Sequence, residues 1–270
     1  MPNVLLIGCG KMGSAMLDGW IRQGKSPTSI IVIEPTDIVA KELHKKYGIT
    51  VYTTRQEIHP NFQPDVVIFA IKPQLINDVV PGYAKIGHQH TVFITIAAGK
   101  TIRTFEHFLG EDKAIVRVMP NLPAIIGMGA IVACPNTITK PEQKKHCTDL
   151  LSANGTVYWI NDENQMDAIT AISGSGPAYI FYFIECLTAC AKSLGLPEEL
   201  ARSLVSLTVH GSSELASKSE NNAEELRKQV TSPHGTTQAA LDILMAPDGL
   251  LTLLEATTTA ACDRSRELAD

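Results

Sequence analysis

The chain has 270 residues, 44% of them hydrophobic, which is enough apolar material for a large buried core. Its formal net charge is −5 and its 23 basic residues are scattered, so it lacks the dense positive surface that nucleic acids and anionic membranes attract. No apolar run reaches the roughly 18 residues that a membrane-spanning helix needs. We therefore expect a globular protein with no nucleic-acid and no membrane partner.

The six cysteines form no CxxC pair with a matching second half, so they predict no metal site. They are Cys9, Cys134, Cys147, Cys186, Cys190 and Cys262. The N-terminus enters an apolar run at once, without the basic segment and the small-residue cleavage site of a secretory signal. We expect buried, reduced thiols in a cytoplasmic protein.

The first part of the chain alternates short apolar runs with stretches of helical spacing. Residues 4–7 are all apolar and are closed by Gly8, which is typical of a strand buried on both faces of a parallel sheet. Helical spacing then continues to Gly24. Further strands are predicted at residues 30–33, 66–70, 92–96, 114–118, 129–133 and 157–160, and further helices at 39–47 and 141–153. This alternation predicts an α/β fold, a doubly wound sheet over residues 1–162.

From Glu163 onward the strand signals stop, so residues 163–270 are predicted to form an all-helical domain. The stretch over residues 178–193 is apolar around most of a helix circumference. A domain of about a hundred residues cannot hide that much apolar surface in one core. We infer a homo-oligomer that assembles through this half. The alternative is a helix that is central to its own bundle.

The segment from Gly8 to Gly13 reads Gly-Cys-Gly-Lys-Met-Gly and joins the first predicted strand to a helix. In that setting Gly8 makes the tight turn, Gly10 lets backbone approach a pyrophosphate, and Gly13 permits close helix packing. The helix start adds free N–H groups and a favourable dipole for the anion. This turn, with Lys11 and Met12, predicts a nicotinamide dinucleotide site. The alternative is a glycine-rich turn without a ligand.

Glu34 ends the second predicted strand about twenty residues further on, where an acid binds the ribose hydroxyls of NAD and repels the extra phosphate of NADP. Pro35 and Thr36 follow it. The Thr36 hydroxyl and nearby free N–H groups also suit a 2′-phosphate, provided that Glu34 turns outward to solvent. NADP and NAD therefore both stay open, and a solvated glutamate at a strand end is a further alternative.

Five further segments carry a resemblance to a known family. They are residues 69–74 (Phe-Ala-Ile-Lys-Pro-Gln), 96–99 (Ile-Ala-Ala-Gly), 117–121 (Arg-Val-Met-Pro-Asn), 174–179 (Gly-Ser-Gly-Pro-Ala-Tyr) and 230–237 (Val-Thr-Ser-Pro-His-Gly-Thr-Thr). In this order they resemble the characteristic blocks of the pyrroline-5-carboxylate reductases, over essentially the whole chain. The last block is the most specific.

The resemblance implies an NAD(P)H-dependent oxidoreductase of proline biosynthesis. Such an enzyme transfers a hydride to the C=N carbon of 1-pyrroline-5-carboxylate and gives L-proline. The resemblance also implies a Rossmann-type domain followed by an all-helical C-terminal dimerisation domain, with dimers often assembled into rings.

The resemblance further implies site residues. Those near the cofactor are Ala70, Ile71, Lys72, Pro73, Ala97, Ala98, Gly99, Met119 and Asn121, and those near the substrate are Glu220, Ser232, Gly235, Thr236 and Thr237. Taken singly, each has a structural alternative. Lys72 suits a solvated lysine, Met119 and Ala97 suit the core, and Glu220 suits a charge at a helix end.

Reduction of a cyclic imine requires a hydride donor near the C=N carbon, a proton for the nitrogen and a grip on the substrate carboxylate. Residues 232–237 lead into a predicted helix over 238–244. The N–H groups of Gly235, Thr236 and Thr237 are placed to converge on that carboxylate. The Thr237 hydroxyl is the candidate catalytic group, which orients the ring nitrogen and relays a proton from water. The alternative is a capping turn without a ligand.

The chain departs from the family pattern at one position. The family usually has two glycines after the proline of the last block, and here the first is His234. Histidine adopts the left-handed conformation less readily than glycine does. An imidazole at this position adds a pH dependence near neutrality if it faces the substrate, and none if it points into solvent.

Two other classes of protein share parts of this pattern. The β-hydroxyacid dehydrogenase and imine reductase group has a similar glycine turn, and its hydroxyacid members carry a catalytic lysine in a KxxNN setting. Here Lys192 is followed by Ser-Leu-Gly, so that motif is absent. The second class is a non-catalytic dinucleotide-sensing protein, against which the intact block at 232–237 argues.

Overall fold

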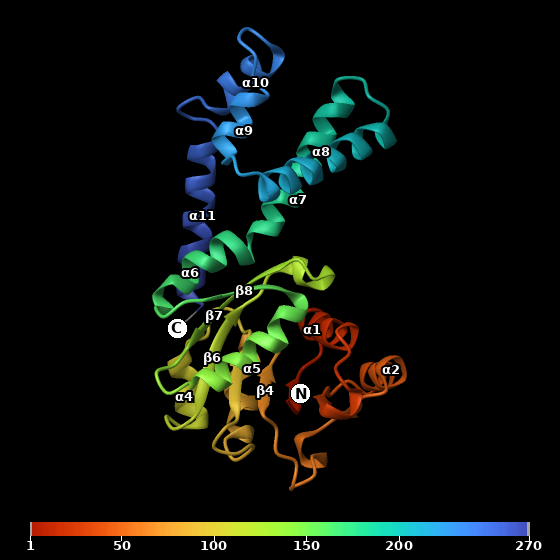
Figure 1. Ribbon diagram of the computed structural model, residues 1–270, viewed down its shortest axis with the longest axis vertical. Helices are drawn as coiled ribbons and strands as arrows, with labels where there is room; N and C mark the ends of the chain where they lie inside the picture. The colour runs from red at the N-terminus through yellow and green to blue at the C-terminus, as the bar shows by residue number, and fades with distance from the viewer. Residues whose placement is uncertain (1, 269–270) are drawn as a thin grey trace. The chain divides into compact units, whose positions relative to one another are not determined.

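The computed structural model describes residues 2–268, which form two compact units (Figure 1). The first contains the residues up to Ser175 and those from Ala261 onward, and the second runs from Gly176 to Ala260. These limits reflect packing, whereas the boundary between residues 162 and 163 rests on a change of sequence pattern. That boundary stays a prediction.

The first unit is built on one eight-stranded sheet with the order β3-β2-β1-β4-β5-β6-β7-β8. The strands are β1 (Val4–Ile7), β2 (Ile30–Ile33), β3 (Thr50–Tyr52), β4 (Val66–Phe69), β5 (Val92–Thr95), β6 (Ala114–Met119), β7 (Gly129–Pro135) and β8 (Gly155–Trp159). Neighbours are parallel except β6 and β7. The predicted α/β doubly wound sheet is confirmed, and β3 is an edge strand that its short, partly exposed sequence did not reveal.

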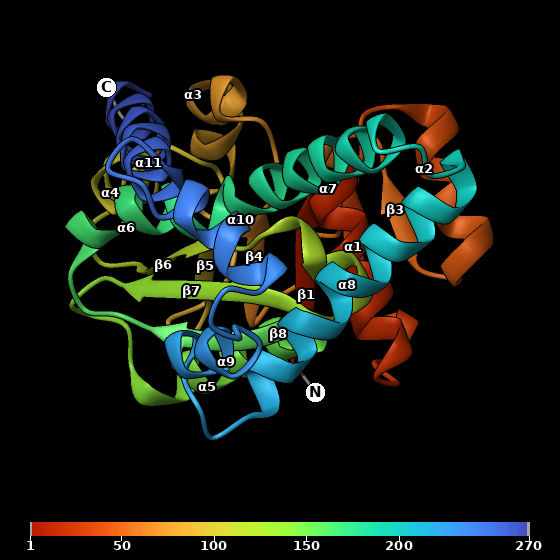
Figure 2. The same cartoon turned by 90° about the horizontal axis from the view of Figure 1, so that it is seen from above.

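Helices cover both faces of this sheet. They are α1 (Lys11–Arg22), α2 (Asp37–Tyr47), α3 (Ile76–Val79), α4 (Ile102–Leu109), α5 (Pro141–Leu151) and α6 (Met166–Ile169). Single 3₁₀ turns lie at Pro27–Ser29, Arg55–Glu57, Pro73–Leu75, Val80–Tyr83, Leu122–Ile126, Ser152–Asn154 and Glu163–Gln165, and a π-helical turn at Thr170–Gly174. Figure 2 shows α3 and α4 on one side of the sheet and α5 on the other.

Each face of the sheet has its own core. On the side of α1 and α5, Trp20 is 1% exposed and its indole N–H donates to the carbonyl of Leu150 at 2.9 Å. On the side of α3 and α4, the ring of Phe69 packs against those of Phe93 and Phe105. Two buried cores explain why the central strands are apolar at almost every position.

The second unit is helical throughout. It contains α7 (Gly176–Ser193), α8 (Glu198–Lys218), α9 (Ala223–Gln229), α10 (Thr236–Leu244) and the part of α11 (Leu250–Glu267) before residue 261. Among its described residues, only the apolar side chains of Ala201 and Val205 are buried. Since α7 buries none of its residues, the alternative of a helix central to its own bundle is wrong for the single chain.

The cysteines divide between the two units. Cys9, Cys134 and Cys147 are buried, whereas Cys186 and Cys190 are exposed on α7. The expectation of six buried thiols is therefore wrong for these two and for the half-buried Cys262. Within the described residues α7 packs against α8, but this contact buries none of its side chains. No helix within residues 2–268 has the length and apolar character to cross a membrane. That same stretch holds no cluster of three potential metal ligands.

Candidate active site

The carboxyl ends of four parallel strands form one edge of the sheet. Ile7 of β1 is paired in register with Phe69 of β4, and Phe69 is paired with Thr95 of β5. Thr95 in turn is paired with Arg117 of β6. The segments that follow these strands carry most of the predicted cofactor residues. The chain leaves β1 for β2 on one side and returns to β4 on the other, so the glycine turn lies at the switch point where open α/β sheets bind ligands.

Two glycines of the turn are required by close packing. Gly8 has a φ of +85°, and its N–H donates to the carbonyl of Ile33 at 2.8 Å. A Cβ on Gly8 would lie 2.7 Å from the carbonyl oxygen of Ala70, and one on Gly13 would lie 2.6 Å from the carbonyl oxygen of Gly8. These contacts leave no room for a side chain at either position.

The third glycine, Gly10, faces open space. A Cβ built on it meets no atom within 4 Å. Gly10 is also the N-cap of α1, where no side chain caps the helix and no acid lies in the first turn. Lys11 beside it is exposed and Met12 is half-buried. An open backbone with free N–H donors and no competing carboxylate fits a pyrophosphate.

Two side chains hold the turn from inside. The hydroxyl of Ser14 donates to the carbonyl of Cys9 at 2.9 Å. The Cys9 side chain is buried, and burial raises the pKa of its thiol. Neither role can be predicted from the sequence, because a serine in a first helical turn and a cysteine between glycines carry no specific signal.

Glu34 points back toward the glycine turn. One carboxylate oxygen accepts the N–H of Cys9 at 3.2 Å, and the other accepts the N–H of Thr36 at 3.0 Å. The residue is 9% exposed. The alternative of a solvated glutamate turned outward is therefore wrong.

The segment after β4 borders the glycine turn. Ala70 contributes the carbonyl that faces Gly8, and Ile71 places its Cγ2 2.7 Å from the position that a Cβ of Gly8 would take. Lys72 is exposed, as expected for a solvated lysine, and Pro73 begins a 3₁₀ turn. Of these residues, Ala70 and Ile71 lie against the turn itself.

The segments after β5 and β6 are more deeply packed. Ala97 and Met119 are 4% and 6% exposed and belong to the core on the α3 and α4 side. The amide oxygen of Asn121 accepts the N–H of Ala130, and its amide nitrogen donates to Ser173. The side chains of Ala97, Met119 and Asn121 thus stabilise the fold. Only the exposed atoms of these residues are available to contact a cofactor.

Gly99 closes the segment after β5, next to the half-buried Ala98. Its φ is +73°, and a Cβ there would lie 2.8 Å from the Cβ of Leu268. The glycine is therefore needed for the approach of the C-terminal segment.

An ion pair between a buried arginine and a half-buried glutamate lies at this edge, and no sequence motif predicts it. Arg117 of β6 is 4% exposed, and its guanidinium lies 2.8 Å from a carboxylate oxygen of Glu163. The same oxygen accepts the N–H of Ile102 at the start of α4. The pair ties β6 to α4. The sequence signal was a charged residue inside an otherwise apolar strand.

The second unit carries the predicted substrate residues at the start of α10. Gly235 is the N-cap, no side chain caps the helix, and no acid lies in its first turn. The N–H of Gly235 donates to the carbonyl of Ser232 at 3.0 Å. The Gly235 N–H is therefore engaged within the loop, and the expectation of three converging N–H groups is wrong for this residue.

The remaining predicted residues of this unit differ in their surroundings. Thr237 is half-buried, whereas Glu220 is exposed in the connection between α8 and α9. No hydrogen bond or ion pair of the described residues joins Glu220 to the loop before α10. His234 has a φ of +61°, so it adopts the left-handed conformation that the sequence indicated. Lys192 pairs with Glu198 at 3.1 Å, at the exposed end of α7.

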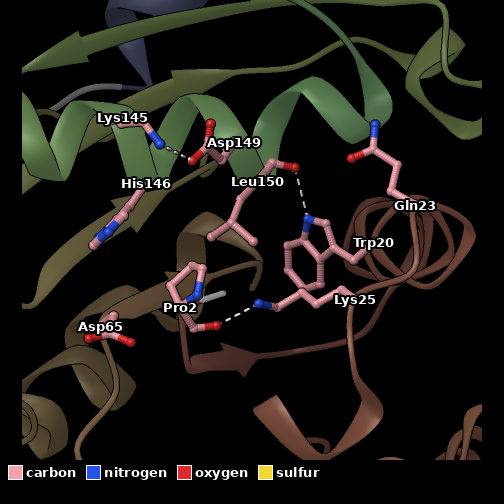
Figure 3. Close-up of a pocket in the computed structure, with 9 residues that line it drawn as sticks. All are labelled: Pro2, Trp20, Gln23, Lys25, Asp65, Lys145, His146, Asp149 and Leu150. Atoms are coloured by element: carbon pink, nitrogen blue, oxygen red, sulfur yellow. Dashed lines mark hydrogen bonds and ion pairs between the residues drawn. The ribbon is translucent and has the colours of Figure 1, made fainter.

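Figure 3 shows a cavity of about 620 Å³ elsewhere in the first unit. It is lined by Pro2, Trp20, Gln23, Lys25, Asp65, Lys145, His146, Asp149 and Leu150. Pro2 and Asp65 precede β1 and β4, so the cavity lies at the amino ends of these strands. The ammonium of Lys25 donates to the carbonyl of Pro2 at 2.5 Å, and burial lowers its pKa. This cavity is separate from the edge with the glycine turn.

Comparison with known proteins identifies a family for both parts of the chain. The model of the pyrroline-5-carboxylate reductase dimerisation family matches residues 163–268, and that of the family described as NADP oxidoreductase coenzyme F420-dependent matches residues 3–99. The pyrroline-5-carboxylate reductase of Pseudomonas aeruginosa is 35% identical over 100% of this chain and 97% of its own length.

Two solved structures extend the comparison. A pyrroline-5-carboxylate reductase from Coxiella burnetii has a TM-score of 0.92 and 34% identity, covering 100% of this chain and 99% of its own. Plasmodium falciparum pyrroline carboxylate reductase, solved with NADP bound, has a TM-score of 0.85 and 28% identity, covering 100% and 98%. From the glycine turn at one end to the loop before α10, this chain belongs to the pyrroline-5-carboxylate reductase family.

Proposed function

We propose that this protein reduces 1-pyrroline-5-carboxylate to L-proline with NAD(P)H, the last step of proline biosynthesis. The observation that carries the proposal is the uncapped start of α10 in the family's most specific block, which suits a small carboxylate. An enzyme that acts on a C=N bond needs such a grip as well as a dinucleotide site, and the chain has both.

The first unit holds the cofactor. The N–H groups at the start of α1 bind the pyrophosphate, and the open backbone at Gly10 allows its approach. The segments after β4, β5 and β6 lie along the same edge and border the nicotinamide half. When bound, the reduced nicotinamide supplies the hydride.

The second unit holds the substrate. The N–H groups of Thr236 and Thr237 bind the substrate carboxylate, and the positive end of the α10 dipole favours its charge. The hydroxyl of Ser232 lies 2.4 Å from the position that a Cβ of Gly235 would take, so Ser232 lies close to these two donors. Gly235 therefore keeps the loop compact rather than supplying a third donor.

Thr237 orients the ring nitrogen. Its hydroxyl both donates and accepts, so it holds the nitrogen and passes on a proton from water. A substrate that arrives with a protonated nitrogen is already electrophilic, and positioning then supplies most of the rate. Glu220, in the connection between α8 and α9, is a further substrate-binding residue in this proposal.

An assay of NAD(P)H oxidation separates this function from the two other classes. We expect turnover with 1-pyrroline-5-carboxylate and none with 3-hydroxy acids in the reverse direction with NAD(P)⁺. The pairing of Lys192 with Glu198 at the end of α7 already disfavours a catalytic lysine there. Turnover of hydroxy acids alone would assign the chain to the dehydrogenase group, and dinucleotide binding without any turnover would indicate a sensing protein.

The protein is a homo-oligomer, in keeping with the match to a dimerisation family over residues 163–268. We propose that dimers form through the helical unit and assemble further into a ring of dimers in the cytoplasm. The exposed apolar side chains of α7 and α8 support the dimer, because they include Phe181 and Leu207 at 55% and 68% exposure. Light scattering of the purified protein measures the number of copies.

A further inference from the structure

The end of β2 carries a carboxylate that is held by backbone alone. Glu34 accepts one N–H from Cys9 inside the glycine turn and one from Thr36 beyond the strand. Its 9% exposure shows that the side chain lies against the protein. These two bonds fix the carboxylate beside the turn, on the side where the adenosine ribose of a dinucleotide lies in this fold.

The backbone donors around Glu34 are already engaged. The 2′-phosphate of NADPH needs N–H groups or cations at this end of the sheet. The N–H of Thr36 is used by Glu34. At the end of the neighbouring β3, the N–H groups of Thr53 and Thr54 donate to one oxygen of Glu57 at 3.0 and 2.9 Å. Carboxylates of the chain therefore occupy donors that a phosphate requires.

The charges nearby are also unsuited to a phosphate. Residues 34–37 read Glu-Pro-Thr-Asp, with two acids and no cation. Lys41 on α2 pairs with Asp37 at 2.5 Å. Lys11 is the exposed cation of the glycine turn itself, next to the pyrophosphate position. A 2′-phosphate at the end of β2 would therefore meet the fixed negative charge of Glu34 without a free cation of the same loop.

We propose that Glu34 makes this enzyme select NADH over NADPH, with its carboxylate accepting hydrogen bonds from the ribose hydroxyls and repelling a 2′-phosphate. The inference rests on the proposed dinucleotide-dependent function but concerns only the adenosine end of the cofactor. The family matched over residues 3–99 is an NADP oxidoreductase family, and the Plasmodium falciparum relative was solved with NADP bound. The proposed selection of NADH therefore concerns residues of this chain and is not carried over from those relatives.

Calorimetry with the full-length protein tests the selection without substrate or turnover. The ligands are NADH, NADPH, 5′-AMP and adenosine 2′,5′-bisphosphate. We expect the wild type to bind NADH at least about tenfold more tightly than NADPH. The Glu34 carboxylate and a 2′-phosphate bound beside it are both negative, and solvent screens the repulsion between such close charges only in part. The two nucleotides without nicotinamide should show the same order.

Three variants assign the effect. Glu34→Ser removes the carboxylate and leaves a hydroxyl, and Glu34→Gln keeps the shape without the charge. Both should shift the ratio of NADPH to NADH affinity by about tenfold or more toward NADPH. Asp37→Asn removes an exposed charge three residues away and serves as the control, since its carboxylate is already paired with Lys41. It should leave the ratio within about threefold.

The remaining outcomes contradict the proposal. A wild type that binds NADPH as tightly as NADH would overturn it. So would Glu34 variants that weaken both dinucleotides equally, because Glu34 would then only support the turn through Cys9. Binding of NADH without turnover of 1-pyrroline-5-carboxylate would refute the proposed reductase and leave the selection standing, whereas a wild type that binds no dinucleotide would refute both.

Discussion

The two units of this chain handle their apolar side chains in opposite ways. In the sheet unit, Trp20, Phe69 and Phe93 are at most 1% exposed. In the helical unit, Phe181, Leu207 and other large apolar side chains are more than half exposed. The sheet unit therefore completes its cores within one chain, whereas the helical unit leaves most of its large apolar side chains exposed.

The difference also separates the two binding regions. The glycine turn is fixed by contacts to Ala70, Ile33 and Glu34 within its own unit. The loop before α10 has few such contacts and contains a residue, His234, in a conformation that favours glycine. The proposed cofactor site is thus supported by contacts within its own unit, whereas the proposed substrate loop belongs to a unit with little buried core.

The largest expected effect is on self-association, when a charge is placed among the exposed apolar side chains of α7 and α8. Phe181→Asp should weaken self-association by about a hundredfold or more, because it places an unpaired carboxylate in an apolar interface. Sedimentation measures the association. Both tryptophans, Trp20 and Trp159, lie in the sheet unit, so their fluorescence should stay unchanged if that unit folds alone. Ile138→Asp, an exposed apolar position of the sheet unit, is the control, and a variant that stays dimeric would place the interface elsewhere.

A second prediction concerns the glycine turn. Gly8→Ala should lower dinucleotide affinity by about a hundredfold, because its Cβ collides with the carbonyl of Ala70 and displaces the turn. Gly24→Ala is a matched control, since Gly24 has a similar φ of +82° but no atom within 4 Å of its Cβ position. The control should lose stability and keep its affinity for NADH in calorimetry. Equal losses of affinity in both variants would show that backbone strain alone disturbs the site.

Thr237 tests the second region in the same way. Thr237→Ala should lower kcat/KM for 1-pyrroline-5-carboxylate by about 10²- to 10³-fold, because the ring nitrogen loses its hydrogen-bonding partner. The dissociation constant of NADH should not change, and Thr237→Ser should recover most of the rate. Steady-state kinetics and calorimetry together measure both quantities. An unchanged rate in the alanine variant refutes the assigned role.

The sequence allowed more to be predicted for the sheet unit than for the helical unit, and the reason is physical. Six of the seven predicted strands are buried along nearly their whole length and are almost entirely apolar, which makes them visible in the sequence. The missed strand β3 has only three residues, and none of them is fully buried. Glycines such as Gly8 are required by backbone contacts, which a short motif encodes. The sequence could not show which way the Glu34 side chain points, because its direction depends on the N–H donors of Cys9 and Thr36.

A smaller effect is expected on the pH dependence of stability. It should arise from the buried thiols of the sheet unit and not from the exposed thiols of α7. Burial, with the nearby charge of Glu163, raises the pKa of Cys134 to about 11. The folded state therefore keeps a proton that the unfolded state releases, so this stability is present below about pH 8.5 and is lost as the pH rises to about 11. Urea unfolding followed by tryptophan fluorescence should show a loss of roughly 1–2 kcal/mol over that range. Cys134→Ala should flatten the slope and Cys186→Ala should not.

The smallest expected effect is at His234. His234→Gly should stabilise the start of α10 by about 0.5–1 kcal/mol, because a side chain at a φ of +61° is strained and glycine is not. His234→Ala should have the opposite sign, since alanine tolerates this region less well than histidine does. Hydrogen exchange of the α10 amides measures both changes. The His234→Gly variant also decides the role of the imidazole. Superimposable pH profiles of kcat/KM for the wild type and this variant place the side chain in solvent, whereas profiles that differ place it beside the substrate.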